Sequence, residues 1–310
     1  MPERFTPQFV RGIRRPDPRR VAAAPQASNY IDLSALKVPE VVEWSNRTGE
    51  YGLYANDRYG CCGPVSIANL IRQWSANDGN PKRPPQDDVF KAYREVGHWN
   101  GSDSGSGTDQ GVDPIALAEY VVNHGLGSSK ASAYVVVDHK NAELVKACHW
   151  LFGGLCVCVN MPTAWRDDPR YANNWPGPMD QRTLNRAEWQ PGGWGGHAIM
   201  SADITAEGLQ CGTWGRLQGL SFNGLKVYGM VVIGFLSPEW FGDDRKAPNG
   251  FDADQLAADM EVIRKGGKIE RNKPTPAPVS NWKREAASLV VSAFGGKYDR
   301  IDDKTDKVTW

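Results

Sequence analysis

The chain of 310 residues lacks a long apolar run, a surplus of charge of either sign and a dense set of cysteines. No stretch approaches the roughly 20 apolar residues that span a bilayer, and residues 1–30 hold arginine and proline where a signal peptide needs an apolar core. Thirty-six basic side chains balance 36 acidic ones, so charge attracts neither nucleic acid nor an anionic membrane. We therefore predict a cytoplasmic protein with no nucleic-acid or membrane partner.

Six cysteines in so long a chain are too few for a disulfide scaffold. Cys156 and Cys158 are separated by one residue, whereas zinc ligands are typically separated by two to four. On a strand both thiols would point to one face. Cys148 and His149 lie in a helical pattern without a matching ligand pair nearby. We expect reduced, buried thiols at these positions and predict neither a metal ion nor a cofactor.

The periodicity of apolar residues changes along the chain. Residues 1–37 alternate arginine with proline and read as an arm that becomes ordered only against a partner. Residues 38–130 are mostly helical, with helices expected at 64–74, 85–96 and 113–124. Residues 131–247 are rich in strands, interrupted by a helical pattern at 142–152. The strands are expected at 133–137, 155–161, 197–204, 208–213 and 226–235. This pattern predicts an α+β domain of two lobes with a cleft between them.

Two further segments fit neither the helical pattern nor the strand pattern. Residues 162–196 form a long connection with four tryptophans, and we expect it to be ordered because so many large aromatic side chains need burial. Residues 248–310 form a C-terminal extension with helices expected at 251–265 and 282–294, joined by a proline-rich spacer at 272–280. The extension either folds back on the domain or binds elsewhere.

A cysteine at the start of a helix and a histidine at the start of a strand suggest nucleophilic chemistry. Cys62 opens the first long helix, where unpaired N–H groups and the helix dipole stabilise a thiolate. His197 opens an apolar strand and can hold the proton that the thiol loses. Cys61 is the alternative nucleophile, and a strained disulfide between the two neighbours is a further alternative. We favour Cys62 because Gly63 follows it directly.

The order of these motifs resembles that of papain-like cysteine peptidases. A segment at 38–44 ends in Glu43-Trp44, Asn56 precedes Cys62 by six residues, Ala198 follows His197, and a Trp-Gly pair stands at 214–215. The Cys-Gly-Pro sequence is also similar to that of bacteriocin-leader peptidases fused to ABC exporters. Chains of this appearance resemble uncharacterised phage and prophage proteins. The resemblance covers roughly residues 38–236.

The resemblance implies a role for each matching residue. Cys62 would attack a carbonyl carbon, and His197 would protonate the departing amine and then activate water. Asn56 would take the oxyanion-hole position that glutamine holds in the family, although Asn56-Asp57 also suits a simple turn. The resemblance, with the motifs, places these residues at the substrate cleft: Gly63, Val157, Trp194, Gly196, Ala198 and Trp214.

The group that orients the histidine departs from the family. Alignment of Trp214-Gly215 puts Gly212 at the position of the family's asparagine, so no side chain remains there. Thr213 would then orient the ring if the strand bulges, and the other candidates are Asp203, Asn160 and a backbone carbonyl. Slow or single-turnover cleavage is therefore as consistent with the sequence as fast turnover.

Three classes of function follow from these residues. The first is a cysteine peptidase or related amide hydrolase that acts on a peptide or protein. The second is a papain-like domain without catalysis that binds an assembly partner through its arm or tail, in the virion if the chain is phage-encoded. The third is a cell-wall peptide hydrolase, suggested by the tryptophan-rich connection, because aromatic platforms also bind sugars.

Overall fold

The computed structural model describes residues 12–31, 33–102, 107–241 and 246–250, together with the backbone of 297–300 and 306–309. The last two segments are strands β9 (Lys297–Arg300) and β10 (Asp306–Thr309), which pair with each other. The helices and the spacer expected between 251 and 294 lie outside the described residues.

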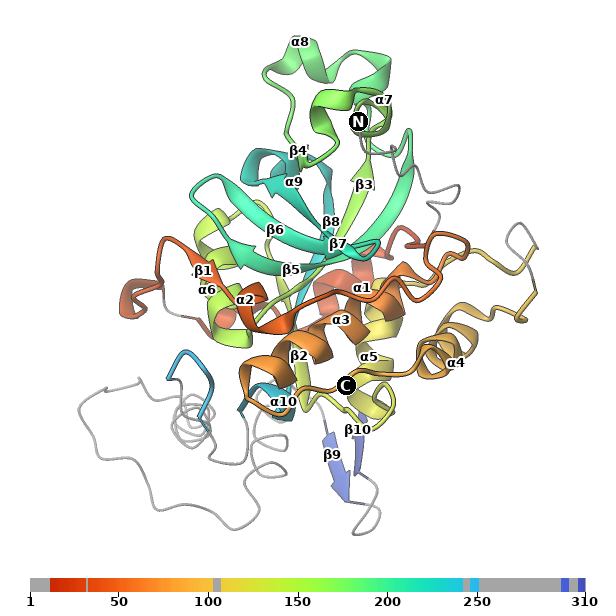
Figure 1. The fold of residues 1–310 in the computed structure, drawn as a ribbon, viewed down its shortest axis with the longest axis vertical. Helices are drawn as coiled ribbons and strands as arrows, with labels where there is room; N and C mark the ends of the chain where they lie inside the picture. Colours follow the sequence, from red (N-terminus) through yellow and green to blue (C-terminus); the bar gives the residue numbers. More distant parts are fainter. Residues whose placement is uncertain are drawn as a thin grey trace.

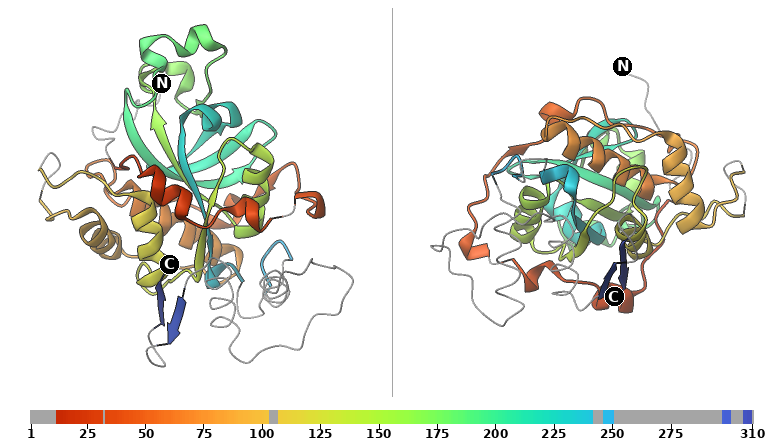
Figure 2. Two further views of the ribbon diagram at one scale, coloured as in Figure 1. Left: turned by 180° about the vertical axis from the view of Figure 1, so that it is seen from behind. Right: turned by 90° about the horizontal axis from the view of Figure 1, so that it is seen from below.

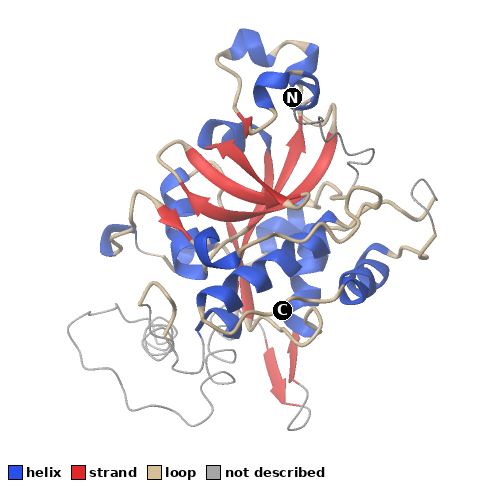
Figure 3. Ribbon diagram, in the orientation of Figure 1, coloured by secondary structure: helices blue, strands red, loops and turns tan. Residues whose placement is uncertain are grey.

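One twisted sheet forms the centre of the fold (Figures 1 and 3). Its strands pair in the order β2, β8, β3, β5, β6, β7, β4, and β1 pairs with β5. All of these pairs are antiparallel except β4 with β7. The strands are β1 (Val42–Glu43), β2 (Ala133–Val137), β3 (Cys156–Met161), β4 (Asn174–Trp175), β5 (Gly195–Ile204), β6 (Gly208–Thr213), β7 (Arg216–Ser221) and β8 (Gly229–Leu236).

The central helix α3 (Cys62–Asn77) packs against β5 and buries every residue except Ala76. None of the described helices is both long and apolar enough to cross a bilayer. The remaining helices are α1 (Pro18–Ala23), α2 (Ser45–Thr48), α4 (Gln86–Gly97), α5 (Pro114–Asn123), α6 (Ala142–Phe152), α7 (Thr163–Asp167), α8 (Gln181–Leu184), α9 (Phe222–Tyr228) and α10 (Pro238–Phe241).

The sheet has one hydrophobic cluster on each face, because successive side chains of a strand point to opposite sides. Cys158 of β3 lies opposite Ala198 of β5, and both belong to the cluster that contains α3. Val157 and Ile199, the next pair along, belong to the cluster on the other face. The strand that carries His197 therefore lies directly beside the helix that carries Cys62.

The α+β prediction is confirmed, and several elements have the predicted bounds. Strands β2 and β6 and helix α6 match residue for residue. The connection at 162–196 is ordered, as predicted, and contains α7, α8, β4 and two short 3₁₀ helices. The strand predicted at 226–235 is wrong in its first part, where α9 extends to Tyr228. Ser221 caps this helix by accepting from the Gly224 N–H, and β8 begins only at Gly229.

The described part of the arm packs on the chain's own domain. Arg20 of α1 pairs with Asp113 and Glu119, at the start and within α5. Further along, the Pro25 carbonyl accepts from the N–H of Val136 in β2. Figure 2 shows this red segment running across the back of the molecule, between the sheet and α5. We predicted an arm ordered only against a partner, and for residues 12–31 the chain itself supplies the contacts.

Candidate active site

Cys62 is the first residue of α3, and its thiol lies against β5. The Ala198 N–H donates to Cys62 Sγ over 3.2 Å. The backbone N–H groups of Cys62 and Gly63, at the open end of the helix, also favour the thiolate. Cys61 is the residue before the helix, and its Sγ instead contacts the Tyr54 carbonyl at 3.7 Å. Of the two neighbouring thiols, that of Cys62 lies beside the strand of His197.

His197 is held by the two residues that end β6 and begin the following turn. Its Nε2 lies 2.7 Å from Thr213 Oγ1, within hydrogen-bond distance. The Trp214 ring stacks on the imidazole, with centroids 4.3 Å apart and planes inclined by 15°. These contacts fix both the rotation and the tilt of the imidazole.

The position of Gly212 corrects the alignment with the family's asparagine. A side chain at Gly212 would not point at His197, because its Cβ would lie 2.8 Å from Met200 Sδ and 3.0 Å from the Tyr51 ring. The next residue, Thr213, faces the imidazole. The hydrogen-bonding position in this chain is therefore occupied, one residue later than the Trp-Gly alignment suggests.

The turn that carries Trp214 has an unusual backbone. Thr213 pairs with Arg216, and the two residues between them, Trp214 and Gly215, have φ of 47° and 74°. A two-residue hairpin turn of type I′ needs positive φ at both positions, which glycine or asparagine usually supplies. Tryptophan is strained there by roughly 1–3 kcal/mol. The fold accepts this strain at the residue that covers His197.

Trp214 is the last member of a continuous aromatic cluster. Trp165 stacks on Trp175, and Trp175 contacts both Trp194 and Trp214. Trp165, Trp175 and Trp189 are buried. These three rings pack inside the protein, whereas Trp194, the fourth tryptophan of the connection, is half-buried. The cell-wall hydrolase that this connection suggested stays a prediction.

Both candidate catalytic groups are almost completely buried. Cys62 is 1% exposed and His197 is 2% exposed. Burial raises the pKa of the Cys62 thiol to about 12, against the opposing N–H of Ala198. Burial also lowers the pKa of His197 to about 3. The described conformation therefore favours a neutral Cys62 thiol and a neutral His197 imidazole.

The N-terminal arm covers the thiol. A Cβ at Gly12 would lie 2.2 Å from Cys62 Sγ, so only glycine fits at this approach. The Gly12 carbonyl accepts from the Val112 N–H at 3.1 Å, and the Arg14 N–H donates to the Val112 carbonyl at 2.9 Å. On the other side, the Ile13 N–H points to the Gly196 carbonyl at 3.4 Å. Residues 12–14 thus lie extended between two backbone edges.

The carbonyls of this segment are not presented for attack. The Gly12 oxygen is bound to Val112, and the Ile13 oxygen packs against Gly196, 2.3 Å from where a Cβ would lie. Neither of these contacts involves an N–H group at the start of α3. The segment therefore blocks Cys62 without being positioned as a substrate.

Three of the predicted cleft residues surround this segment. Gly63 lies beneath Ile13, whose Cδ1 would be 3.3 Å from a Cβ there. Gly196 and Ala198 contact Ile13 and Cys62 through their backbones. We predicted Val157 at the cleft, but its side chain belongs to the cluster on the face of the sheet opposite Cys62. Cys158 is the residue of β3 that belongs to the cluster of Cys62. Trp194 packs behind Trp214 with ring centroids 5.7 Å apart.

Asn56 occupies a tight turn before α3. Its backbone N–H donates to the Leu53 carbonyl, and its Nδ2 donates to the Tyr59 carbonyl at 2.9 Å. The intervening residues Tyr54 and Ala55 have positive φ. The side chain is buried within its own loop, as the simple-turn interpretation requires. The hydrogen that binds Tyr59 is not directed at the cleft.

The other candidate orienting residues are engaged elsewhere. Asp203 accepts from the N–H and the hydroxyl of Ser45 at 2.8 and 2.7 Å. Asn160 lies opposite Gly196 on the neighbouring strand, and its side chain packs against Gly192. Neither makes the contact with His197 that Thr213 makes.

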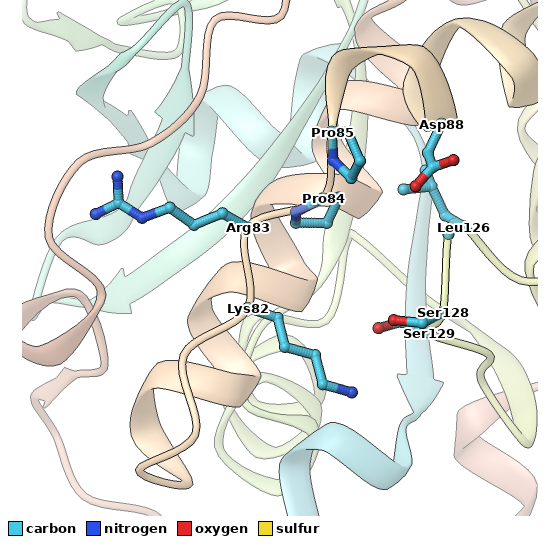
Figure 4. A pocket seen from close by; sticks show the side chains of 9 residues that line it. Lys82, Arg83, Pro84, Pro85, Asp88, Leu126, Ser128 and Ser129 are labelled. Atoms are coloured by element: carbon cyan, nitrogen blue, oxygen red, sulfur yellow. The ribbon is translucent and has the colours of Figure 1, made fainter.

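The remaining thiols are buried and free of disulfides. Cys156 Sγ lies 3.2 Å from Ser66 Oγ, inside the cluster around α3. No group of three or more His, Cys, Asp or Glu side chains suited to a metal ion occurs among the described residues. A pocket lies at the start of α4 (Figure 4), and Asp88, Leu126 and Ser129 are among the residues that line it. No predicted site residue lines this pocket.

Sequence reasoning missed the residues that close the cleft. Gly12 and Ile13 lie in a segment that composition marks only as an arm, and Val112 stands just before a helix. Glycine between apolar and basic residues was the available signal for Gly12, since a close approach of backbone needs it. Asp109 and Tyr93, which bind each other and the backbone at Gly60 and Gly111, carried no pattern that distinguishes them from other polar core residues.

No protein-family model and no curated protein matches the chain. Among solved structures it is similar to xylellain, a cysteine protease from Xylella fastidiosa, with 11% identity over 74% of this chain and 94% of that one and a TM-score of 0.48. It is also similar to procathepsin B from Trypanosoma congolense, with 12% identity over 73% and 86% and a TM-score of 0.46. Procathepsin L2 from Tenebrio molitor is 14% identical over 76% and 80%, with a TM-score of 0.43.

Proposed function

We propose that the chain is a papain-like cysteine peptidase that uses Cys62 and His197 and is held closed by its own arm. The observation that carries the proposal is the arrangement of Cys62 at the start of α3, beside the strand of His197, with the imidazole bound by Thr213 and covered by Trp214. A buried structural cysteine would need neither the helix N-terminus nor an oriented imidazole.

The reaction follows from these groups once the arm has left the cleft. His197 takes the thiol proton, and the Cys62 thiolate attacks the carbonyl carbon of a peptide bond. The C–N bond breaks, His197 protonates the leaving amine, and a thioester remains on Cys62. His197 then removes a proton from water, which attacks the thioester, and the carboxylic acid and the thiol are released. The N–H groups at the start of α3 would bind the oxyanion. Asn56 would contribute only after releasing the Tyr59 carbonyl.

The arm must move before this chemistry can begin. Gly12 lies against the Cys62 thiol and Ile13 packs against Gly196, next to His197, and burial of the two groups opposes formation of the thiolate and imidazolium. Displacement of residues 12–14 would hydrate both groups and bring their pKa values together. The backbone pairing of residues 12–14 with Val112 and Gly196 would therefore keep the peptidase inactive.

The sealed, neutral pair also favours a second candidate, a papain-like domain that binds a partner without catalysis. In that case the arm is a permanent part of the core, and Cys62 stays a protonated thiol. Association with a virion and a cytoplasmic location both stay predictions, and the substrate proposed for the peptidase is a peptide or protein.

The experiment compares the full-length chain with its Gly12→Val variant, in which the new side chain collides with Cys62 Sγ and displaces the arm. Iodoacetamide labelling, followed by peptide mapping, measures access to Cys62, and cleavage of a peptide library measures activity. We expect slow labelling and little cleavage in the parent, and fast labelling and cleavage in Gly12→Val. Ile13→Asp, which places a charge in the apolar site of Ile13, serves as a second opening variant.

Two substitutions in the opened chain decide between the candidates. Cys62→Ala and His197→Ala should each abolish cleavage, and His197→Ala should return Cys62 labelling to the pH profile of an ordinary thiol. An opened chain that cleaves nothing, and whose labelling does not change in His197→Ala, would establish the binding domain instead.

A further inference from the structure

We propose that Asp109 is a positioning residue of this site, which holds the turn that carries Cys62 and the backbone edge at Val112 in register. The inference rests on the proposed function for its effect on catalysis. Its structural part, the placement of the peptide-pairing edge, does not depend on catalysis.

A single carboxylate oxygen of Asp109 connects the two parts. Asp109 Oδ1 accepts from the Gly60 N–H at 3.0 Å, two residues before Cys62. The same oxygen accepts from the Tyr93 hydroxyl of α4. The Tyr93 oxygen in turn accepts from the Gly111 N–H at 3.0 Å, one residue before Val112. The nucleophile turn and the pairing edge, which lie about 50 residues apart in sequence, thus share one anchor.

Burial of the Asp109 carboxylate costs free energy of desolvation, so packing alone does not explain why a carboxylate stands here. Asp109 is 4% exposed, and its Oδ2 is buried without a hydrogen-bond partner. Tyr93 stacks on Trp99, which also contacts Tyr59, so the surroundings are largely aromatic. An apolar side chain would fill such a place at lower cost in desolvation. The carboxylate provides what an apolar side chain cannot, an acceptor for Gly60 and for Tyr93 at once.

Val112 is the edge on which an extended peptide pairs. In the closed structure its N–H and carbonyl bind Gly12 and Arg14 of the arm. A substrate that enters the same space would meet the same two groups, with Cys62 on one side and Gly196 on the other. A shift of Val112 by about 1 Å relative to Cys62 would move the peptide carbonyl away from Sγ, and misplacement of that size can cost about 100-fold in rate.

The same carboxylate separates the behaviour of the two neighbouring thiols. Burial raises the pKa of Cys61 well above its ordinary value, and the neighbouring carboxylate of Asp109, together with any thiolate formed at Cys62, raises it further. Cys62, by contrast, receives N–H groups from Ala198 and Gly63 that favour its thiolate. Asp109 therefore supports the use of Cys62 alone.

The test uses Tyr93→Phe and Asp109→Leu in the full-length chain, with Tyr228→Phe as the matched control. Tyr93 and Tyr228 are both fully buried, and each loses a hydroxyl in a hydrogen bond, but Tyr228 donates to the Trp189 carbonyl, away from Val112. Asp109→Asn keeps an acceptor for Gly60 and should rescue part of the effect. Two readouts are taken, and only the second requires catalysis.

The first readout is protection of Cys62 from iodoacetamide in the closed chain. A displaced Val112 holds the arm less well, so Tyr93→Phe and Asp109→Leu should raise the labelling rate about tenfold or more, while Tyr228→Phe leaves it unchanged. The second readout is kcat and KM for a peptide in the Gly12→Val background. We expect kcat/KM to fall about tenfold or more, while labelling of Cys62 by the small reagent, which needs no pairing edge, is preserved.

Each outcome decides a separate claim. Unchanged protection in both variants, with kcat/KM equal to that of the Tyr228→Phe control, overturns the role of Asp109. Loss of protection in the closed variants, together with an opened Gly12→Val chain that cleaves nothing, overturns the proposed peptidase but supports the positioning of Val112. Equal losses in all three variants would show a general loss of stability and would also overturn the proposal.

Discussion

Thr213 Oγ1 lies 2.7 Å from Nε2 of His197. The hydroxyl comes from the last residue of β6, and the next residue, Trp214, covers the imidazole from the turn. One hairpin end therefore supplies both contacts to the ring. A hydroxyl is a smaller and weaker partner than a carboxamide or a carboxylate, and stacking supplies the restraint that the single hydrogen bond lacks.

Removal of the Thr213 hydroxyl should reduce catalysis without closing the site. In the Gly12→Val background, Thr213→Val keeps the shape of the side chain, and we expect kcat/KM to fall by up to about 10⁴-fold, the loss known for an orienting group in a serine triad. Thr213→Ser keeps the hydroxyl and should retain most of the activity. Steady-state hydrolysis of one peptide substrate measures both. Equal activity in the two variants would mean that Trp214 alone orients the ring.

The reactivity of Cys62 should depend on pH differently in the closed and opened chains. In the closed chain burial raises the pKa of the thiol to about 12, so labelling by iodoacetamide should stay slow between pH 5 and about 9. In Gly12→Val, hydration and the nearby imidazole should bring the labelling midpoint below about 8.5, the value of a free thiol. Rates measured by mass spectrometry over this pH range check the difference. Identical profiles would show that the arm does not control the thiol.

The two neighbouring cysteines should differ in labelling and in effect. The Cys61 thiol contacts the Tyr54 carbonyl, so Cys61→Ala should leave labelling of the other thiol and peptide cleavage nearly unchanged in the opened chain. Cys62→Ala should remove both. Peptide mapping of the labelled chain distinguishes them. Labelling that persists on Cys61 in Cys62→Ala, together with cleavage, would reverse the assignment.

Acid should destabilise the fold through two buried histidines. Burial lowers the pKa of His149 and of His197 to about 3, below the 6.5 of an exposed histidine. The unfolded chain therefore binds protons that the folded chain does not, and stability present above pH 6.5 is lost as pH falls towards 3. Each histidine contributes about 1.4 kcal/mol per pH unit within that window.

Replacement of His149 tests this linkage away from the active site. His149 Nδ1 lies 2.7 Å from Ser201 Oγ, and His149→Gln offers a neutral group there. Urea unfolding at pH 6.5 and pH 5 should show a smaller loss of stability on acidification in His149→Gln than in the parent. An equal loss in both chains would contradict the low pKa of His149.

Local patterns sufficed to predict the elements that carry the two main site residues. Cys62 precedes Pro64 at the start of an apolar helix, and the alternation after His197 is that of a buried strand, so both positions follow from local rules. The cap at Asp113 is also local, since its side chain accepts from the Ala116 N–H three residues later.

The remaining features of the site depend on contacts that no local pattern encodes. The pairing of Met200 with Gly212 sets Thr213 on the same face as Cys211 and Ile199, and the register shift between Ser201 and Asp203 lies beyond these pairs. No local pattern encodes which residue of β6 pairs with which residue of β5. Gly12 reaches Cys62 only through pairing with Val112, about 100 residues away in sequence. The α9 helix replaced part of a predicted strand because a serine cap outweighed the β-branched residues that follow.

The covalent connection of residues 12–14 to the domain also determines how their hold on the cleft responds to dilution. While the chain is intact the segment competes for the cleft at a fixed effective concentration, in the millimolar range for a short tether. Restraint of Cys62 is then independent of protein concentration. A single cut between residues 14 and 18 would turn the same segment into a free ligand, which separates from the cleft as the solution is diluted.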